Sequence, residues 1–318
     1  MYMSKKIKNI YLLLVIVVFS LLCGGCEEMG GYIDFDKPQK TPVSAGDKQP
    51  MAMGQRPLRI AFASVISPKE TRTSYQEMVN YISKELGQPA VLIQRKTYEE
   101  LNMLVAGGEA DVAFVSTGAY TAYNGMTPIE ILAMVQTDGT VFYKSYLIVN
   151  ADSDIQELSQ LQGRIFAFTD PLSYSGRMAI DYMLQDRYNT TAENFFKRCF
   201  YTYNHDKSLW AVANKLADGA GIDSQIYDFA ARTNPEMVSK VRIIESMSPT
   251  PTGPVIMRKD LPERTKLQLQ NIFYNMSKEP SLEQAMERVM IEKFIEPEPQ
   301  LYNDLRRKYR HRENLPGA

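Results

Sequence analysis

The feature that most constrains the fold is a regular alternation, from Leu58 onward, of short apolar runs with amphipathic segments. Short apolar runs indicate buried strands, and apolar residues three or four positions apart indicate helices. Strands that alternate with helices form βαβ units around a mostly parallel sheet, so the fold class is α/β. We expect strands over 58–63, 91–94, 111–115, 129–136, 164–168, 199–203, 219–222, 240–245 and 254–258. We expect helices over 74–86, 98–106, 175–184 and 207–216 and after Asp223, and helical structure from the end of the last strand to Lys308.

The alternation falls into two series, which predicts two lobes. The series are joined by extended stretches at residues 142–150 and 246–258. If both stretches cross between the lobes, one lobe contains residues 57–144 and 247–318, and the other contains residues 145–246. The two crossings would form a hinge, and ligands bind where the parallel strands of such lobes end.

The N-terminal segment is predicted to be an export signal. Three lysines precede an apolar run from Ile10 to Cys23, which is too short for a comfortable membrane span and has the length of a signal-peptide core. Residues 22–26 resemble a bacterial lipobox, so we expect residues 1–25 to be removed and Cys26 to be acylated. An ordinary secretory signal is the alternative. Residues 26–56 lack any helical or strand period and are predicted to be a flexible tether.

Charge and composition exclude several classes of protein. The chain has 36 Lys and Arg against 37 Asp and Glu, so it lacks the basic surplus of a nucleic-acid-binding protein. Its cysteines, at positions 23, 26 and 199, are too few for a disulfide framework, and with only His205 and His311 beside them a structural zinc site is not expected. No metal, nucleotide or organic cofactor is implied.

The segment from Phe168 to Gly176 (FTDPLSYSG) has the pattern of an anion-binding turn. It follows a strand and enters a helix, where backbone N–H groups have no partner within the helix. These donors, the helix dipole and the hydroxyls of Ser173 and Ser175 can hold a tetrahedral oxyanion, and Gly176 permits a close approach. The alternative role of one serine is a simple helix N-cap.

Further polar residues follow other strands at the same edge. Ser116 and Thr117 come after the strand DVAFV and can form a second anion-binding turn or a cap. His205 follows CFYTY and can donate a hydrogen bond to an oxyanion, although a lone histidine is more often structural. Asp223 follows GAGI and is either a ligand-binding acid or the N-cap of the next helix.

The run from Ser145 to Gly176 (SYLIVNADSDIQELSQLQGRIFAFTDPLSYSG) resembles the second-lobe opening of the phosphate, phosphite and phosphonate ABC-transporter substrate-binding proteins. DVAFVSTGAYTAY (111–123), His205-Asp206 and GAGIDSQIYD (219–228) support the resemblance, which extends from Leu58 to about Lys308. It implies the two-lobe periplasmic-binding-protein fold of the second type.

The resemblance also implies a function and further site residues. A member of this family captures a phosphorus oxyanion between its lobes and delivers it to an ABC permease with its ATPase, as a monomer held at the cell envelope by its lipid anchor. Tyr98 and Tyr143 match cleft tyrosines of the family, and an acid at Asp223 meets a ligand ammonium or a protonated oxygen. The chain departs from the family pattern at two positions. Ala119 stands where the family has serine, and Tyr174, between Ser173 and Ser175, stands where the family usually has threonine.

Two other functions fit some of the same residues. Ser173, His205 and Asp223 are the residue types of a hydrolase triad, but the Gly-x-Ser-x-Gly elbow is missing and no oxyanion loop is evident, so we expect no enzyme. A sensory lipoprotein that presents its ligand to a receptor would have an identical site.

Overall fold

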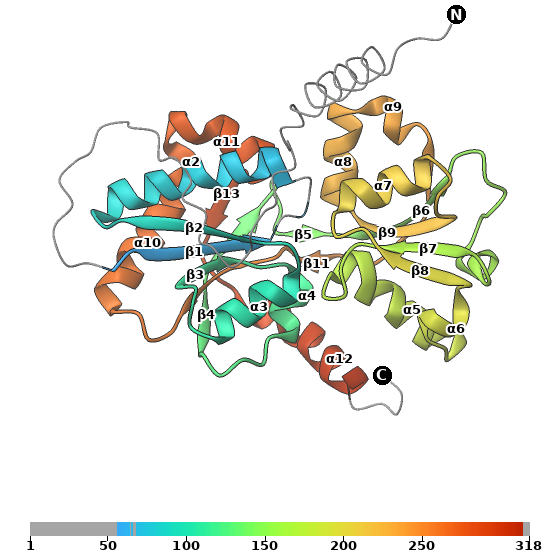
Figure 1. The fold of residues 1–318 in the computed structure, drawn as a ribbon, viewed down its shortest axis with the longest axis horizontal. Helices are drawn as coiled ribbons and strands as arrows, with labels where there is room; N and C mark the ends of the chain where they lie inside the picture. The colour runs from blue at the N-terminus through green and yellow to red at the C-terminus, as the bar shows by residue number, and fades with distance from the viewer. Residues whose placement is uncertain (1–55, 64, 66–67, 314–318) are drawn as a thin grey trace, which may run out of the picture. The chain divides into compact units, whose positions relative to one another are not determined.

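The computed structural model describes residues 56–63, 65 and 68–313. The predicted signal peptide, Cys26 and the tether up to residue 55 lie outside the described residues. The described strands form a six-stranded sheet, a five-stranded sheet and a two-stranded ladder that joins them (Figure 1). We call the part of the chain around the six-stranded sheet the first lobe and the part around the five-stranded sheet the second lobe.

The six-stranded sheet draws strands from both ends of the described chain. Its order is β13-β4-β12-β3-β1-β2. The strands are β1 (Leu58–Ala63), β2 (Ala90–Arg95), β3 (Val112–Phe114), β4 (Ile129–Gln136), β12 (Val255–Arg258) and β13 (Lys293–Ile295). Residues of β1 alternate between two cores, with Ile60 and Phe62 on one face and Ala61 and Ala63 on the other. Burial on both faces explains why this strand is apolar at every position except Arg59.

Helices cover both faces of this sheet (Figure 1). One core includes side chains of α2 (Pro68–Leu86), α10 (Glu263–Asn275) and α11 (Glu283–Arg288). The other core includes side chains of α3 (Tyr98–Ala106) and α4 (Thr117–Ala122), together with Tyr302, which precedes α12 (Asn303–Glu313). Helix α3 begins at a capping box, in which Thr97 and Glu100 satisfy each other's backbone N–H groups.

The five-stranded sheet has the order β10-β6-β9-β7-β8. Its strands are β6 (Ser145–Asn150), β7 (Ile165–Phe168), β8 (Arg198–Tyr201), β9 (Gly219–Asp223) and β10 (Val241–Ser246). In Figure 1, α5 (Ala179–Tyr188) and α6 (Ala192–Phe195) lie on one side of it, and α7 (His205–Ala213), α8 (Ser224–Thr233) and α9 (Pro235–Val238) lie on the other. Short helical turns complete the chain: η1 (Leu158–Leu161), η2 (Tyr174–Met178), η3 (Met276–Lys278), η4 (Pro280–Leu282) and η5 (Pro299–Tyr302).

The chain passes between the sheets through a small antiparallel ladder. β5 (Phe142–Tyr143) leads into the second lobe and β11 (Thr250–Pro251) leads back, and they pair through Tyr143 with Thr250 and Phe142 with Pro251. The ladder lies between the two sheets in Figure 1. Because both passages are hydrogen-bonded to each other, a bend at one of them must be shared by the other.

The α/β class is confirmed, but both sheets are mixed rather than mostly parallel. β1 pairs in parallel with β2 and β3, and β7 pairs in parallel with β8 and β9. β12 runs antiparallel to β3 and β4, and β6 runs antiparallel to β9 and β10. The antiparallel direction follows from the crossing between the lobes. β6 and β12 come directly from the ladder and enter their sheets at the edge where the neighbouring strands end, so they run in the opposite direction.

Two local expectations need correction. Helix α2 begins at Pro68, before the expected start at Ser74. The region after Arg258 is not all helical, because Lys293–Ile295 forms strand β13 and pairs antiparallel with β4. A strand of three residues is too short to show a period in the sequence. It is recognised only in the structure, by its pairing with β4.

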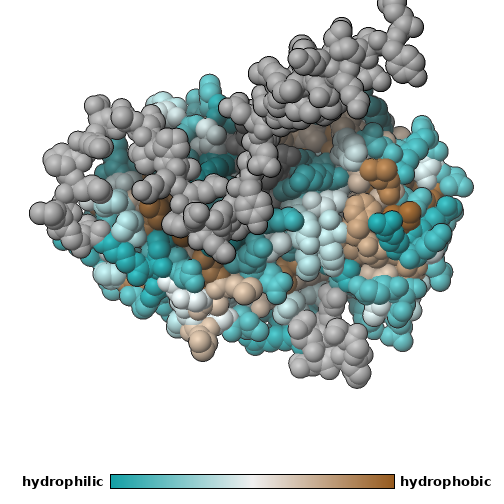
Figure 2. All heavy atoms as spheres, in the orientation of Figure 1, coloured by the Kyte–Doolittle hydropathy of each residue, from teal (hydrophilic) through white to brown (hydrophobic). Residues whose placement is uncertain are grey.

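Hydrophilic residues predominate on the face shown in Figure 2, and hydrophobic ones occupy separate patches. Large exposed apolar side chains include Trp210, Leu216 and Leu267. Scattered exposure of this kind is normal for a water-facing surface. Within the part of the chain that the structure describes, no helix has both the length and the apolar character that a membrane crossing requires.

Candidate functional site

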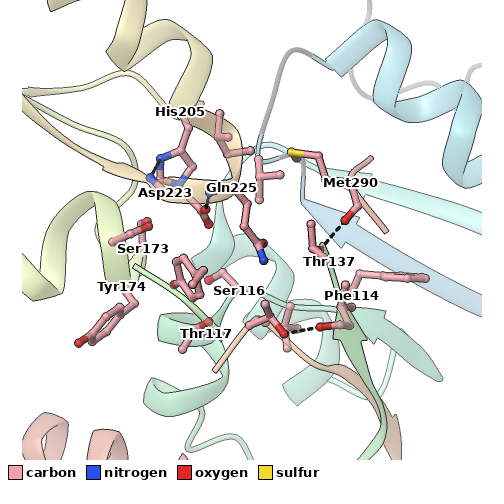
Figure 3. A pocket seen from close by; sticks show the side chains of 18 of the residues that line it. Phe114, Ser116, Thr117, Thr137, Ser173, Tyr174, His205, Asp223, Gln225 and Met290 are labelled. Carbon is pink, nitrogen blue, oxygen red and sulfur yellow. Dashed lines mark hydrogen bonds between the residues drawn. The ribbon is translucent and has the colours of Figure 1, made fainter. Parts of the chain in front are cut away.

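A cavity of about 120 Å³ lies where the strands of both lobes end. The first lobe contributes Ala63 at the end of β1 and residues 115–117 after β3, and the second lobe contributes residues 173–175, His205 and Asp223 (Figure 3). The sequence-predicted residues that line it are Tyr98, Ser116, Thr117, Tyr143, Ser173, Tyr174, Ser175, His205 and Asp223. The structure therefore brings together all the predicted residues except Gly176.

Gly176 lies behind the cavity and supports its wall. Its N–H donates to Ser173 Oγ at 3.0 Å, and a Cβ at this position would overlap the Thr169 side chain. Glycine is therefore required so that the turn can pack against the end of β7. The residue belongs to the site through Ser173 rather than through the lining.

Ser173 is the N-cap of the turn that follows β7, as the alternative interpretation of the sequence predicted. The first turn, η2, is a π-helical turn that continues into α5. Ser173 Oγ accepts from Gly176, which leaves its hydroxyl hydrogen able to donate, and Ser175 is buried beside it in the lining. Capping and anion binding are thus compatible functions of the same serine.

The hydroxyls of Ser116 and Thr117 are used within the protein. Ser116 caps α4, where its Oγ accepts from Ala119 N at 3.1 Å and donates to Leu172 O at 3.3 Å. Thr117 Oγ1 donates to Pro251 O at 2.8 Å. What this turn offers a ligand is therefore the backbone N–H groups at the start of α4 rather than hydroxyl hydrogens.

His205 is the first residue of α7 and its side chain is buried. Its Nδ1 accepts a hydrogen bond from the backbone N–H of Asp223 at 3.2 Å, and Thr169 Oγ1 lies at the same distance from that atom. Because a backbone N–H only donates, Nδ1 carries no proton and the neutral ring is protonated at Nε2. Burial lowers the pKa of His205 to about 3, so the neutral ring offers a single N–H donor.

Asp223 ends β9 and caps α8. Its Oδ1 accepts from the N–H of Gln225 at 2.7 Å. Burial raises the pKa of the Asp223 carboxyl to about 7, although the N–H groups of Gln225 and Ile226 oppose the shift. An ionised Asp223 would repel a fully ionised oxyanion, so a shared proton between the two favours binding.

Three of the predicted residues in the lining are tyrosines. Tyr98 begins α3, and its backbone N–H donates to Asp170 Oδ2 of the second lobe at 3.1 Å. Tyr143 lies in the crossing strand β5, and burial together with the nearby Asp223 raises the pKa of its phenol. Its ring meets that of Tyr174 edge to face, with the centroids 6.5 Å apart. These phenols remain protonated and can donate hydrogen bonds.

A family model described as "ABC transporter, phosphonate, periplasmic substrate-binding protein" matches residues 60–302. The chain belongs to this family. The phosphonates-binding periplasmic protein of Escherichia coli (strain K12) is 26% identical to it over 240 residues, which make up 74% of this chain and 70% of that protein. The predicted family is thus confirmed, and the chain is a periplasmic substrate-binding protein of phosphonate ABC transport.

Solved structures agree with this fold. A binding component of an ABC phosphonate transporter from Pseudomonas aeruginosa has a TM-score of 0.72 at 20% identity, covering 81% of this chain and 87% of that one. A Prochlorococcus marinus (MIT 9301) protein in complex with methylphosphonate has a TM-score of 0.72 at 19% identity, covering 81% and 98%. The periplasmic-binding-protein fold of the second type is confirmed.

The two lobes touch each other around the cavity. Besides the bonds from Tyr98 to Asp170 and from Ser116 to Leu172, the N–H of His205 donates to Val65 O at 3.0 Å. Contacts of this kind, made between opposite walls, describe a closed arrangement.

Gly118 shows how tightly the lobes meet. A Cβ at this position of α4 would overlap Leu172 O and would lie 2.8 Å from the backbone N of Tyr174. The anion-binding turn of the second lobe therefore rests on a helix of the first lobe at a point where only glycine fits.

No Lys or Arg occurs among the described residues that line the cavity, so the hydrogen-bond donors of the lining are neutral. Basic side chains gather instead in a neighbouring groove beside residues 202–204, which is lined by Arg72, Arg95, Lys96 and Lys207. Lys96 Nζ lies 4.7 Å from the centre of the Tyr203 ring. A positive groove outside a neutral site attracts anions to this side of the protein.

Gln225 and the apolar wall of the cavity were not expected from the sequence. Gln225 lies two residues after Asp223, in the first turn of α8, and its side chain enters the cavity (Figure 3). Val289, Met290 and Ile291 line the opposite part and come from the segment before the undetected strand β13. The helix position of Gln225 was a usable signal, whereas nothing in the sequence linked residues 289–291 to the site.

Proposed function

We propose that this protein closes its lobes, residues 57–144 with 247–318 and residues 145–246, over one phosphonate. The phosphonate oxygens accept hydrogen bonds from Ser173, Ser175, His205 Nε2 and the backbone N–H groups at the starts of α4 and η2, and Asp223 shares a proton with them. The observation that carries the proposal is the convergence of donors from strand ends of both lobes on one small cavity.

The protein binds its ligand without transforming it. In a hydrolase triad the histidine Nδ1–H donates to the aspartate carboxylate. His205 Nδ1 instead accepts from the backbone N–H of Asp223, and the Asp223 carboxylate accepts from Gln225 N. This arrangement supports a binding site and leaves Ser173 without a base oriented to activate it.

The loaded protein delivers the phosphonate to an ABC permease and its ATPase. Residues 1–25 act as a signal peptide, acylated Cys26 attaches the monomer to the membrane, and residues 26–56 allow the body to reorient toward the permease. The lipobox-like residues 22–26 and the absence of periodicity in the tether support this part of the proposal.

Calorimetry with methylphosphonate tests the proposed site. Ser175→Ala removes a lining hydroxyl without removing the helix cap, and Ser173→Ala removes the cap as well. A hydrogen bond to a charged oxygen contributes about 1.5 to 3 kcal/mol, so each variant should weaken binding roughly tenfold or more.

The exposed Ser239→Ala variant is the matched control. Thermal unfolding of the ligand-free variants separates the loss of the Ser173 cap, which costs about 1 kcal/mol, from the loss of ligand contacts. Unchanged affinity in the Ser173→Ala, Ser175→Ala double variant would place the phosphonate elsewhere.

A further inference from the structure

Gln225 has a buried polar atom that the protein leaves unpaired. Its backbone N–H donates to Asp223 Oδ1. Its side-chain Nε2 is buried and has no hydrogen-bond partner among the described residues. An unpaired buried donor costs about 1 to 3 kcal/mol, and such groups are rare in native proteins. Figure 3 shows the Gln225 side chain extending between Ser116 and Met290. Its amide is therefore placed to donate to a ligand oxygen.

The part of the cavity beyond Gln225 is apolar. It is lined by Phe114, Val135, Val289, Met290 and Ile291. The threonine hydroxyls on this side are already used, because Thr137 Oγ1 donates to Met290 O and Thr252 Oγ1 donates to Val135 O, each at 2.6 Å. A polar ligand group against this wall would lose its hydration without gaining hydrogen-bond partners. The wall therefore favours an apolar, carbon-containing group of the ligand.

Carboxylates are scarce in the lining. Asp223 is the one acidic residue among the described residues that border the cavity, and it lies with His205 at the polar side. An ammonium group on the ligand would need a carboxylate near the apolar wall to offset its desolvation. The lining therefore disfavours a charged amino substituent.

The volume of the cavity leaves room for a substituent on the phosphorus. A water occupies about 30 Å³ in the liquid, so a cavity of about 120 Å³ has room for roughly four waters. Phosphate and methylphosphonate have the same number of heavy atoms, so the chemistry of the wall rather than the volume separates them. Phosphate would turn an oxygen toward apolar side chains, whereas a short carbon substituent places carbon there.

We propose that Gln225 is a ligand-binding residue and that the cavity takes phosphonates with a small, uncharged carbon substituent. The amide Nε2 donates to an oxygen of the ligand, and the substituent lies on the wall formed by residues 289–291, Phe114 and Val135. The inference rests on the proposed function, since it names the ligand class of the same site.

Calorimetry with methylphosphonate, ethylphosphonate, 2-aminoethylphosphonate and inorganic phosphate tests the ligand class. The wild-type protein should bind the two alkylphosphonates at least tenfold more tightly than phosphate or the amino compound. A preference for phosphate or for the amino compound would overturn the proposed class while leaving the proposed function intact. If none of these ligands binds, the proposed function fails and the inference fails with it.

Two substitutions test Gln225 itself. Gln225→Leu keeps much of the volume but removes the donor, and it should weaken methylphosphonate binding about 10- to 100-fold. Gln225→Glu puts a carboxylate beside the wall. It should weaken methylphosphonate binding further and raise the affinity for 2-aminoethylphosphonate relative to that for methylphosphonate. The exposed Gln162→Leu and Gln162→Glu variants are the matched controls. Affinities of Gln225→Leu within twofold of wild type would exclude the amide as a ligand contact.

Met290 allows an independent test of the wall. Its φ of 58° is in the left-handed region, where glycine is favoured, so Met290→Gly shortens the side chain without straining the backbone. This variant should lose several-fold in its preference for ethylphosphonate over phosphate. An unchanged preference would show that the substituent does not lie on residues 289–291.

Discussion

At the scale of single residues, Asp223 combines a helix cap with the ligand contact that we propose for it. It caps α8 through the N–H of Gln225, and burial raises the pKa of its carboxyl to about 7. The folded state therefore holds a proton between about pH 4 and pH 7 that the unfolded state has released. Stability from this group is complete at low pH and is lost as the pH rises to about 7.

Asp223→Asn separates the two functions. Asparagine caps helices as well as aspartate does, so the fold is retained. Because the variant lacks the buried titrating carboxyl, its unfolding free energy relative to wild type should increase by on the order of 2 kcal/mol between pH 5 and pH 8. Urea unfolding of ligand-free protein at both pH values measures this, with the exposed Asp186→Asn as control. An equal difference at the two pH values would contradict a buried acid with a raised pKa.

At the scale of elements, closure depends on how near α4 can come to the turn before α5. Ser116 and Gly118 contact that turn from the first lobe, and Asp170 reaches back to accept from the N-terminus of α3. Each contact joins the N-terminal end of a helix or the loop before it to the opposite lobe. The helix ends that are proposed to supply donors to the ligand therefore also hold the lobes together.

Gly118→Ala should hinder closure. The added Cβ would overlap Leu172 O, whereas alanine is the better helix former and should leave the ligand-free protein as stable as wild type or slightly more stable. Affinity for methylphosphonate should fall tenfold or more, and small-angle scattering should show a smaller decrease in radius of gyration on binding. In the control Gly107→Ala, the new Cβ lies 3.4 Å from its nearest neighbour, an ordinary contact. Normal closure of the Gly118 variant would refute the steric argument.

At the scale of the whole molecule, the predicted anchor determines where the body works. A diacylglyceryl group on Cys26 gives stable membrane attachment, which a single acyl chain does not. Cys26→Ser should therefore release the protein from membranes or leave it unprocessed, as fractionation and mass spectrometry can show. Cys199→Ser is the control for loss of a thiol. Membrane association equal to that of wild type would indicate an uncleaved signal anchor instead.

Much of this protein could be predicted from its sequence because the signals are local. Apolar runs such as residues 58–63 and helices such as residues 98–106 form where the period places them. Polar residues directly after strands, among them Ser173 and His205, meet at one cavity because strand ends of a sheet share an edge.

Only the tertiary structure decided the rest. The antiparallel entry of β6 and β12 follows from where the chain crosses between lobes, and β13 exists because β4 offers an edge. The use of the Ser116 and Thr117 hydroxyls within the protein, the unpaired amide of Gln225 and the wall at residues 289–291 depend on which distant segments pack together. Local periodicity records which face of an element is buried, but it does not record what that face or its end will meet.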